Sequence, residues 1–154
     1  MSRKISHGLP RYTESIAGSL LAAREAVMAP IRPHLRASNV TEQQWRVLRV
    51  LADATSLDAR GIAEAALLYA PTVTRILKEL GERKLIIRHI DPVDGRRSII
   101  SITEEGLSLV HDTAKHTRTL IDAYIEEFGR ERLEAFRLEA KALAAALAKF
   151  KPGD

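Results

Sequence analysis

The segment "RHIDPVDGRRSIISIT", residues 88–103, constrains the fold more than any other part of the chain. Apolar residues alternate at both of its ends, and its middle holds charged residues, Pro92 and Gly95. This pattern predicts a β-hairpin with Arg96 and Arg97 at its tip. Because an isolated pair of strands is marginal in water, neighbouring helices must support the hairpin. The two arginines at the tip indicate a partner outside it.

Helical periodicity precedes the hairpin. Residues 10–35 carry apolar side chains at helical spacing, and Pro30 and Pro33 should bend or split this helix before a turn at residues 38–39. Thr41 is the expected N-cap of the next helix, "TEQQWRVLRVLAD". The chain is therefore expected to reach its central region through two successive helical segments.

Two shorter helices are expected in the sequence just before the hairpin. Asp58 is placed to cap "DARGIAEAALL", and Pro71 suits the first turn of "APTVTRILKELGERK". The second of these helices has an inward apolar stripe made of Val73, Ile76, Leu77 and Leu80. Two helices joined by a tight turn and followed by a hairpin are typical of a winged helix-turn-helix.

A long helix should run from about Glu104 to Phe128, where Gly129 breaks it before a last helix. The last helix has an apolar seam at steps of three and four residues, formed by Leu133, Phe136, Ala140, Leu143, Leu147 and Phe150. This seam is either internal core or a subunit interface. Because long helices at both ends cannot all bury their stripes on so small a centre, we favour a second copy of the chain.

The expected fold is therefore mainly α with a small β-hairpin wing, a winged helix-turn-helix with long terminal dimerisation helices. We expect one domain over residues 1–154, in which residues 10–36 and 104–150 form the dimerisation helices and residues 41–102 form the DNA-binding lobe. The outward face of the helix after Tyr69 carries the candidate DNA contacts, which are Pro71, Thr72, Thr74, Arg75 and Lys78. Arginine suits the two acceptors of guanine, although a solvated helix face would show a similar pattern.

Composition is consistent with a nucleic-acid partner. The chain has 154 residues, with 24 Lys and Arg against 20 Asp and Glu, a formal net charge of +4. It has no cysteine, so a disulfide framework and a thiolate metal site are excluded and a cytoplasmic location is the simplest expectation. No apolar run is long enough to cross a bilayer.

The sequence shows no motif that is typical of an enzyme. His111 and His116 are five positions apart, about 140° around a helix, so they do not share a face for a metal. No nucleophile elbow, phosphate-binding glycine loop or cysteine nucleophile is present. We therefore expect no enzymatic activity, no metal and no cofactor.

The order of these segments resembles the MarR family of bacterial transcriptional regulators over nearly the whole chain. Asp94, Gly95 and Arg96 match the family's Asp-x-Arg wing motif, and "SITEEG" matches the start of its long helix. "LLAAREAVMAPIRP" joined to "VTEQQWRVLRVL" is similar to the branch that represses homoprotocatechuate degradation, a pathway of aromatic compound catabolism.

The resemblance implies a homodimer that acts as a repressor and whose two winged lobes bind a pseudo-palindromic, double-stranded DNA operator. Recognition helices would enter successive major grooves, and Arg96 would reach a narrow minor groove. Asp94 would brace the wing through a salt bridge rather than contact DNA. Arg97 would serve either phosphates or this brace, and the spacing does not decide between them.

The resemblance also implies that the regulator is released by a small aromatic carboxylate. Arg24 lies on one helical line with Leu20, Val27 and Ile31, and Arg46 follows Trp45 at the start of the next helix. Since a buried arginine needs an anion, Arg24, Trp45 and Arg46 are candidate effector contacts. Arg24 could equally pair with a carboxylate of the protein, such as a glutamate of the partner chain, and Trp45 is better explained as core.

A helical adaptor that binds other proteins through its terminal helices is the alternative function. It would leave Arg75 and Arg96 without a role, and salt-sensitive retention on DNA separates the two functions. The operator, the regulated genes, the identity of the effector and the choice between repression and activation remain open at this stage.

Overall fold

The structure is a computed structural model that describes residues 8–150. These residues are mostly helical and contain one two-stranded antiparallel hairpin, as the sequence predicted. The elements are a short 3-10 helix Tyr12–Glu14, α1 Ile16–Met28, α2 Arg32–Ala37, α3 Glu42–Asp53, α4 Ala59–Ala66, α5 Ala70–Glu82, β1 Ile86–Ile90, β2 Ser98–Ile102, α6 Glu104–Phe128 and α7 Arg130–Leu147. The chain divides into two compact units within α6, between Ala114 and Lys115.

The N-terminal helical segment is split, and it starts later than the periodicity suggested. Pro10 precedes the short 3-10 helix, and α1 begins at Ile16 with the Ser15 hydroxyl accepting from the Gly18 backbone N–H at 3.0 Å. The helix ends before Pro30, and Pro33 lies in the first turn of α2. The predicted split at the prolines is therefore confirmed, whereas the predicted start near Pro10 is wrong.

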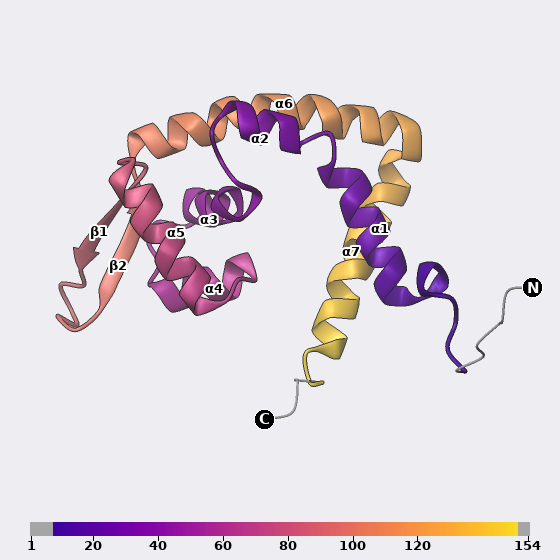
Figure 1. Ribbon diagram of the computed structural model, residues 1–154, viewed down its shortest axis with the longest axis horizontal. Helices are drawn as coiled ribbons and strands as arrows, with labels where there is room; N and C mark the ends of the chain where they lie inside the picture. Colours follow the sequence, from indigo (N-terminus) through magenta and orange to yellow (C-terminus); the bar gives the residue numbers. More distant parts are fainter. Residues whose placement is uncertain (1–7, 151–154) are drawn as a thin grey trace, which may run out of the picture. The chain divides into compact units, whose positions relative to one another are not determined.

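The centre of the first unit is a lobe of α3, α4 and α5 that contact one another. Strand β1 packs on α5, and β2 packs on α3 and α4, so the hairpin has the helical support it needs (Figure 1). Residues with no exposed surface come from α3, α4, α5 and β2 and include Val47, Leu48, Leu51, Ile62, Val73, Ile76, Leu80 and Ile100. The inward stripe predicted for α5 is confirmed, because its four members are buried.

The predicted caps are also present. The Thr41 hydroxyl accepts from the backbone N–H of Gln44 at 3.1 Å, and the Gln44 side chain accepts from the backbone N–H of Thr41, which completes a capping box. The Asp58 carboxylate accepts from the backbone N–H of Gly61 at 2.8 Å. These caps fix where α3 and α4 begin, so the core faces of both helices point into the lobe.

Two backbone contacts anchor the wing to the lobe. Leu57, just before α4, exchanges backbone hydrogen bonds with Ile100 of β2 at 3.0 and 2.7 Å. Where β2 runs into α6, Gly106 lies so close to the backbone that an added Cβ would stand 2.2 Å from the Leu85 carbonyl oxygen. A larger residue at position 106 would push the start of α6 away from the hairpin.

The second unit holds the end of α6 and all of α7. Gly129, with φ of 95°, separates the two helices where the sequence placed the break. No residue of α7 is buried in the single chain, and Phe136 and Leu147 are both 47% exposed. The apolar seam of this helix therefore remains open within one chain. Across residues 8–150, no helix is long and apolar enough to span a membrane.

Candidate nucleic-acid interface

Helix α5 presents the predicted DNA-contacting residues on its outward face. Pro71, Thr74, Arg75 and Lys78 are exposed and Thr72 is partly buried, opposite the stripe that packs into the lobe. The Thr74 hydroxyl donates to the Ala70 carbonyl at 3.1 Å, and its oxygen can still accept a hydrogen bond. The structure thus brings these residues together on one surface, while their contacts with DNA stay a prediction.

Arg75 and Lys78 differ in how they are held. The Arg75 Nη1 donates to Glu79 Oε1 at 2.8 Å, one turn later on the same helix. Among the described residues, Lys78 has no ion pair. A tethered guanidinium suits a fixed contact with a base edge, whereas a free ammonium suits a phosphate, which offers oxygens in several directions.

The wing presents Arg96 at its tip. Asp91 and Arg97 close the loop through a backbone hydrogen bond of 2.8 Å from the Asp91 N–H to the Arg97 carbonyl. The Arg96 side chain is exposed, and it has no ion pair within the part of the chain that the structure describes. Its guanidinium is therefore available for the minor-groove contact that the family resemblance implies.

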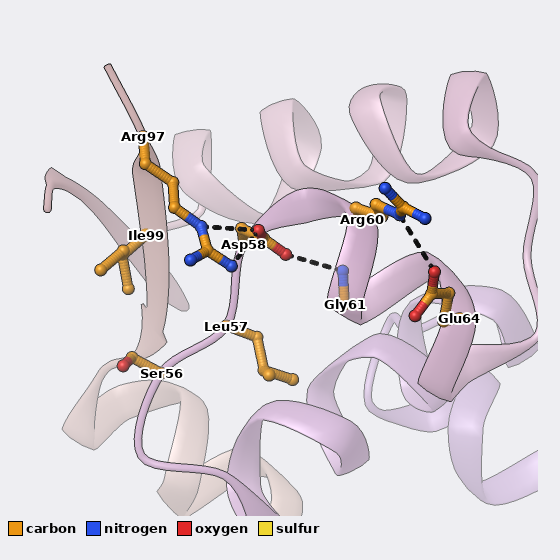
Figure 2. A pocket seen from close by; sticks show the side chains of 8 residues that line it. All are labelled: Ser56, Leu57, Asp58, Arg60, Gly61, Glu64, Arg97 and Ile99. Carbon is orange, nitrogen blue, oxygen red and sulfur yellow. Dashed lines mark hydrogen bonds and ion pairs between the residues drawn. The ribbon is translucent and has the colours of Figure 1, made fainter. Parts of the chain in front are cut away.

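Arg97 is used differently. Its Nε and Nη2 donate to Asp58 Oδ2 at 2.8 and 2.5 Å, while the other oxygen of Asp58 caps α4 (Figure 2). These contacts raise the pKa of Arg97 through the hydrogen bond and charge of Asp58. They also lower the pKa of Asp58, chiefly through the Gly61 N–H and then through Arg97. Arg97 thus braces the wing against α4 in this structure, and a contact of Arg97 with phosphates stays a prediction.

Within residues 8–150, Asp94 does not form the salt bridge that the family resemblance implied. Its carboxylate accepts from the backbone N–H of Arg96 at 3.1 Å, and its carbonyl accepts from the Arg97 N–H at 2.9 Å. These are turn contacts, since a short carboxylate two residues before an N–H is well placed to reach it. Asp94 therefore shapes the tip through the backbone, and the ion pair that ties the wing to the lobe belongs to Asp58.

The candidate effector contacts lie at the junction of α1 and α3, and Arg24 is not buried as the sequence suggested. Its side chain is 45% exposed, and it pairs with Glu42 and, at 3.3 Å, with Glu25. Arg32 donates to Glu25 at 2.8 Å and to Glu42 at 3.0 Å. The protein carboxylate that we considered for Arg24 is present, but it comes from the same chain. Leu20 and Val27, its neighbours on the helical line, are 40% and 44% exposed.

Trp45 is buried in the lobe, and Arg46 is partly buried. Trp45 is 7% exposed, as the core interpretation predicted. Arg46 donates to the carbonyls of Ala66 and Leu67 at the end of α4, where Leu67 adopts a left-handed conformation with φ of 53°. Burial lowers the pKa of Arg46, and the charge of Arg24 adds to this effect. Arg46 therefore caps a helix C-terminus in this structure.

Two exposed residues of the lobe, Arg49 and Tyr69, were not singled out from the sequence. The Arg49 guanidinium lies 5.8 Å from the centre of the Trp45 ring, and its spacing of four residues on one helix could have indicated this contact. Tyr69 is 85% exposed immediately before α5, where a phenol can reach a phosphate. Its position just ahead of the predicted recognition helix was the available signal.

Comparison with known proteins places this geometry in a family. The MarR family profile matches residues 38–97, which run from the end of α2 to the wing. The chain is 37% identical over 137 residues to the regulator FarR of Neisseria gonorrhoeae, covering 89% of this chain and 91% of that protein. It is 39% identical over 97 residues to the homoprotocatechuate degradative operon repressor of Escherichia coli, covering 62% of this chain and 65% of that protein.

A solved structure agrees with the sequence matches. The structure of NadR in complex with 4-hydroxyphenylacetate has a TM-score of 0.76 and 36% identity, and the match covers 93% of this chain and all of NadR, 100%. FarR is a transcriptional regulator and the Escherichia coli protein is an operon repressor, so these relatives are regulators rather than enzymes. The matches to FarR and NadR extend over 89% and 93% of this chain and so include both the lobe and flanking helices. The chain belongs to the MarR family of DNA-binding transcriptional regulators.

Proposed function

We propose that this chain is a homodimeric repressor that binds a pseudo-palindromic DNA operator and is released by a small aromatic acid. The observation that carries the DNA-binding part is the pairing of an outward basic face on α5 with an exposed Arg96 on a wing clamped to the same lobe. A recognition helix fits the major groove, and an arginine on the wing fits a narrow minor groove beside it.

Dimer formation follows from apolar surface that one chain leaves uncovered. In the first unit, Ile16 and Leu21 of α1 are 68% and 47% exposed. In the second, α7 has no buried residue at all. Apolar faces of this extent are covered in stable proteins, and a second copy covers them with two-fold symmetry. Two lobes related in this way would read the two halves of a pseudo-palindrome.

The aromatic acid is proposed from the relatives and from the residues near α1. NadR, 36% identical, is described as a complex with 4-hydroxyphenylacetate. In this chain Arg24 lies close enough to Arg46 for its charge to lower the pKa of Arg46, and Trp45 directly precedes Arg46 in α3. Guanidinium groups bind carboxylates through two parallel hydrogen bonds, and an aromatic side chain packs against a ring. We include Arg49 because its guanidinium already stacks on Trp45.

The test begins with the whole protein and a pool of random double-stranded DNA. Repeated selection should enrich a sequence with two-fold symmetry, and binding to it should fall steeply as salt rises. Sedimentation should show a dimer at micromolar concentration. No enrichment of any sequence would refute the operator and would favour the protein-binding adaptor, and a folded monomer would refute the dimer.

Calorimetry with 4-hydroxyphenylacetate tests the sensor. We expect binding to the wild type, weaker binding to Arg24→Ala and Arg46→Ala, and release of the selected DNA. By linkage, the acid must bind more weakly to the DNA-bound protein by the same factor. Unchanged affinity in both variants would move the pocket elsewhere. Failure of aromatic acids to bind would remove the sensor and leave DNA recognition intact.

A further inference from the structure

The outward arginine of α5 is held by a chain of hydrogen bonds that begins in the buried part of the lobe. Arg75 Nη1 donates to Glu79 Oε1 at 2.8 Å, and the two side chains are 58% and 37% exposed. An exposed pair of this kind is ordinarily weak and mobile, because solvent competes for both groups. Here the carboxylate has a second partner that limits its movement.

That partner is Gln44 of α3. Gln44 Nε2 donates to Glu79 Oε2 at 2.9 Å, and the residue is only 8% exposed. Its Oε1 accepts from the Thr41 backbone N–H at 3.1 Å as part of the capping box. The Gln44 amide therefore uses its oxygen at the start of α3 and its nitrogen on Glu79. Rotation of this amide would break both contacts, so the position of Glu79 is fixed from within the lobe.

The position of Glu79 determines how Arg75 can meet DNA. Both hydrogen bonds to Glu79, that of Gln44 first, lower the pKa of its carboxyl, so it is ionised at neutral pH. The guanidinium donates one N–H from Nη1 to this carboxylate and keeps its Nε and Nη2 donors for a second planar partner. Guanine offers O6 and N7 in a geometry that matches two such donors.

The Glu79 carboxylate also weakens binding to DNA that does not depend on sequence. A negative charge beside the recognition face repels phosphates, which supply most of the affinity for DNA of any sequence. Glu79 thus orients the arginine toward a base and lowers its attraction to the backbone. Both effects increase the difference between the operator and random DNA.

We propose that Glu79, fixed by Gln44, is a positioning residue that determines the base specificity of Arg75. The proposal rests on the proposed function, because it requires α5 to read an operator through Arg75. Neither Glu79 nor Gln44 contacts DNA in this arrangement. Their effect is transmitted through the orientation of one guanidinium.

The experiment uses the full chain and the duplex selected from random DNA as described above. Affinity is measured by fluorescence anisotropy for that duplex, for versions in which each guanine pair in turn is replaced by an adenine pair, and for random DNA. Arg75→Ala should lose about tenfold in discrimination at one position, the value typical of a lost bidentate contact. Glu79→Gln should lose discrimination at that same position and should bind random DNA more tightly.

Glu82→Gln is the matched control. Glu82 is an exposed residue of the same helix, so the variant removes the same charge while the hydrogen bonds of Glu79 to Arg75 and Gln44 stay in place. It should tighten binding to random DNA as Glu79→Gln does, but it should keep the base preference. In the Arg75→Ala background, Glu79→Gln should cause no further loss of discrimination. These two results separate the orientation of the arginine from the general effect of charge.

Gln44→Met tests the inner part of the chain of contacts. It removes the amide and should reduce discrimination at the same position. Thr41→Ala weakens the same capping box but leaves the Gln44 amide on Glu79, so its base preference should stay unchanged. Circular dichroism and urea unfolding confirm that each variant is folded before its affinity is compared.

Two outcomes overturn the proposal and are distinguishable. If Glu79→Gln keeps the base preference within about twofold while Arg75→Ala loses it, Arg75 reads a base without help from Glu79, and the proposed function stands. If Arg75→Ala also keeps the preference at every position, then the role of Arg75 in the proposed function fails together with the positioning role.

Discussion

The contact between the wing and α4 makes a sharp prediction because one residue, Asp58, serves both elements. Its Oδ1 caps α4 through the Gly61 N–H, and its Oδ2 receives two hydrogen bonds from Arg97. Asp58→Ala removes both contacts. Loss of an N-cap acceptor costs about 0.5 to 2 kcal/mol of the free energy of unfolding. The ion pair adds a smaller amount, since the Arg97 side chain is 57% exposed and solvent screens the pair.

Asp58→Asn separates the two contributions. Asparagine keeps an oxygen for the Gly61 N–H and is as good an N-cap as aspartate, but it removes the charge that faces Arg97. We therefore expect Asp58→Asn to lose less than about half of what Asp58→Ala loses. Urea unfolding at one fixed protein concentration measures both losses, because the stability of a dimer depends on concentration.

Both variants should also weaken DNA binding, because both remove the carboxylate that holds Arg97. Asp58→Asn releases Arg97 and with it the brace of the wing, so binding should weaken most at sites with a narrow minor groove. Arg97→Ala should reproduce this loss, and the double variant should add little to it. Equal losses of stability for Asp58→Asn and Asp58→Ala would refute the reasoning, because the cap would then contribute nothing beyond the charge.

Three further predictions concern other parts of the chain. Leu143→Asp places a charge in the open seam of α7 and should yield monomers or unfolded protein in sedimentation, whereas Ala145→Asp, about 200° around the helix, should leave the dimer intact. Arg75→Ala should relax sequence preference by about 1 to 3 kcal/mol, while Arg96→Ala should weaken binding chiefly at narrow minor grooves. Fluorescence anisotropy with matched duplexes measures both effects, and an equal loss of affinity on all DNA would contradict them. Because the folded pKa of Asp58 lies below its ordinary value of 3.8, its stabilising effect is complete above that value and is lost as the pH falls through the lower folded pKa, so the stability difference between wild type and Asp58→Asn should shrink in acid.

Local signals in the sequence predicted the elements of this fold well. The caps Thr41 and Asp58, the helix-starting Pro71 and the break at Gly129 each act within a few residues of their own position. Such residues favour one backbone conformation whatever the rest of the chain does. The hairpin at residues 86–102 was equally clear, because its alternation and its turn residues agree with each other.

Side-chain partners that are far apart in sequence could not be predicted in this way. Asp58 and Arg97 are 39 positions apart, and Gln44 and Glu79 are 35 positions apart. Each contact depends on how two elements dock, and no periodicity encodes that. The exposure of Arg24 was misjudged for a related reason, because a helical line shows which residues share a face but not what covers that face.

The pairing of Arg24 bears directly on how an effector would act. If an aromatic carboxylate binds there as proposed, it takes the place that Glu42 now holds on Arg24. Glu42 also pairs with Arg32, so the two arginines connect α1 and α2 to the first turn of α3. That turn contains Gln44, which fixes Glu79 and through it Arg75. Displacing Glu42 would therefore detach α1 and α2 from this turn and let Gln44 shift relative to Glu79, a movement that loss of the Thr41 cap alone does not cause. An effector acting by this route would reduce base discrimination as well as affinity, and a shift in lobe spacing alone would reduce only affinity.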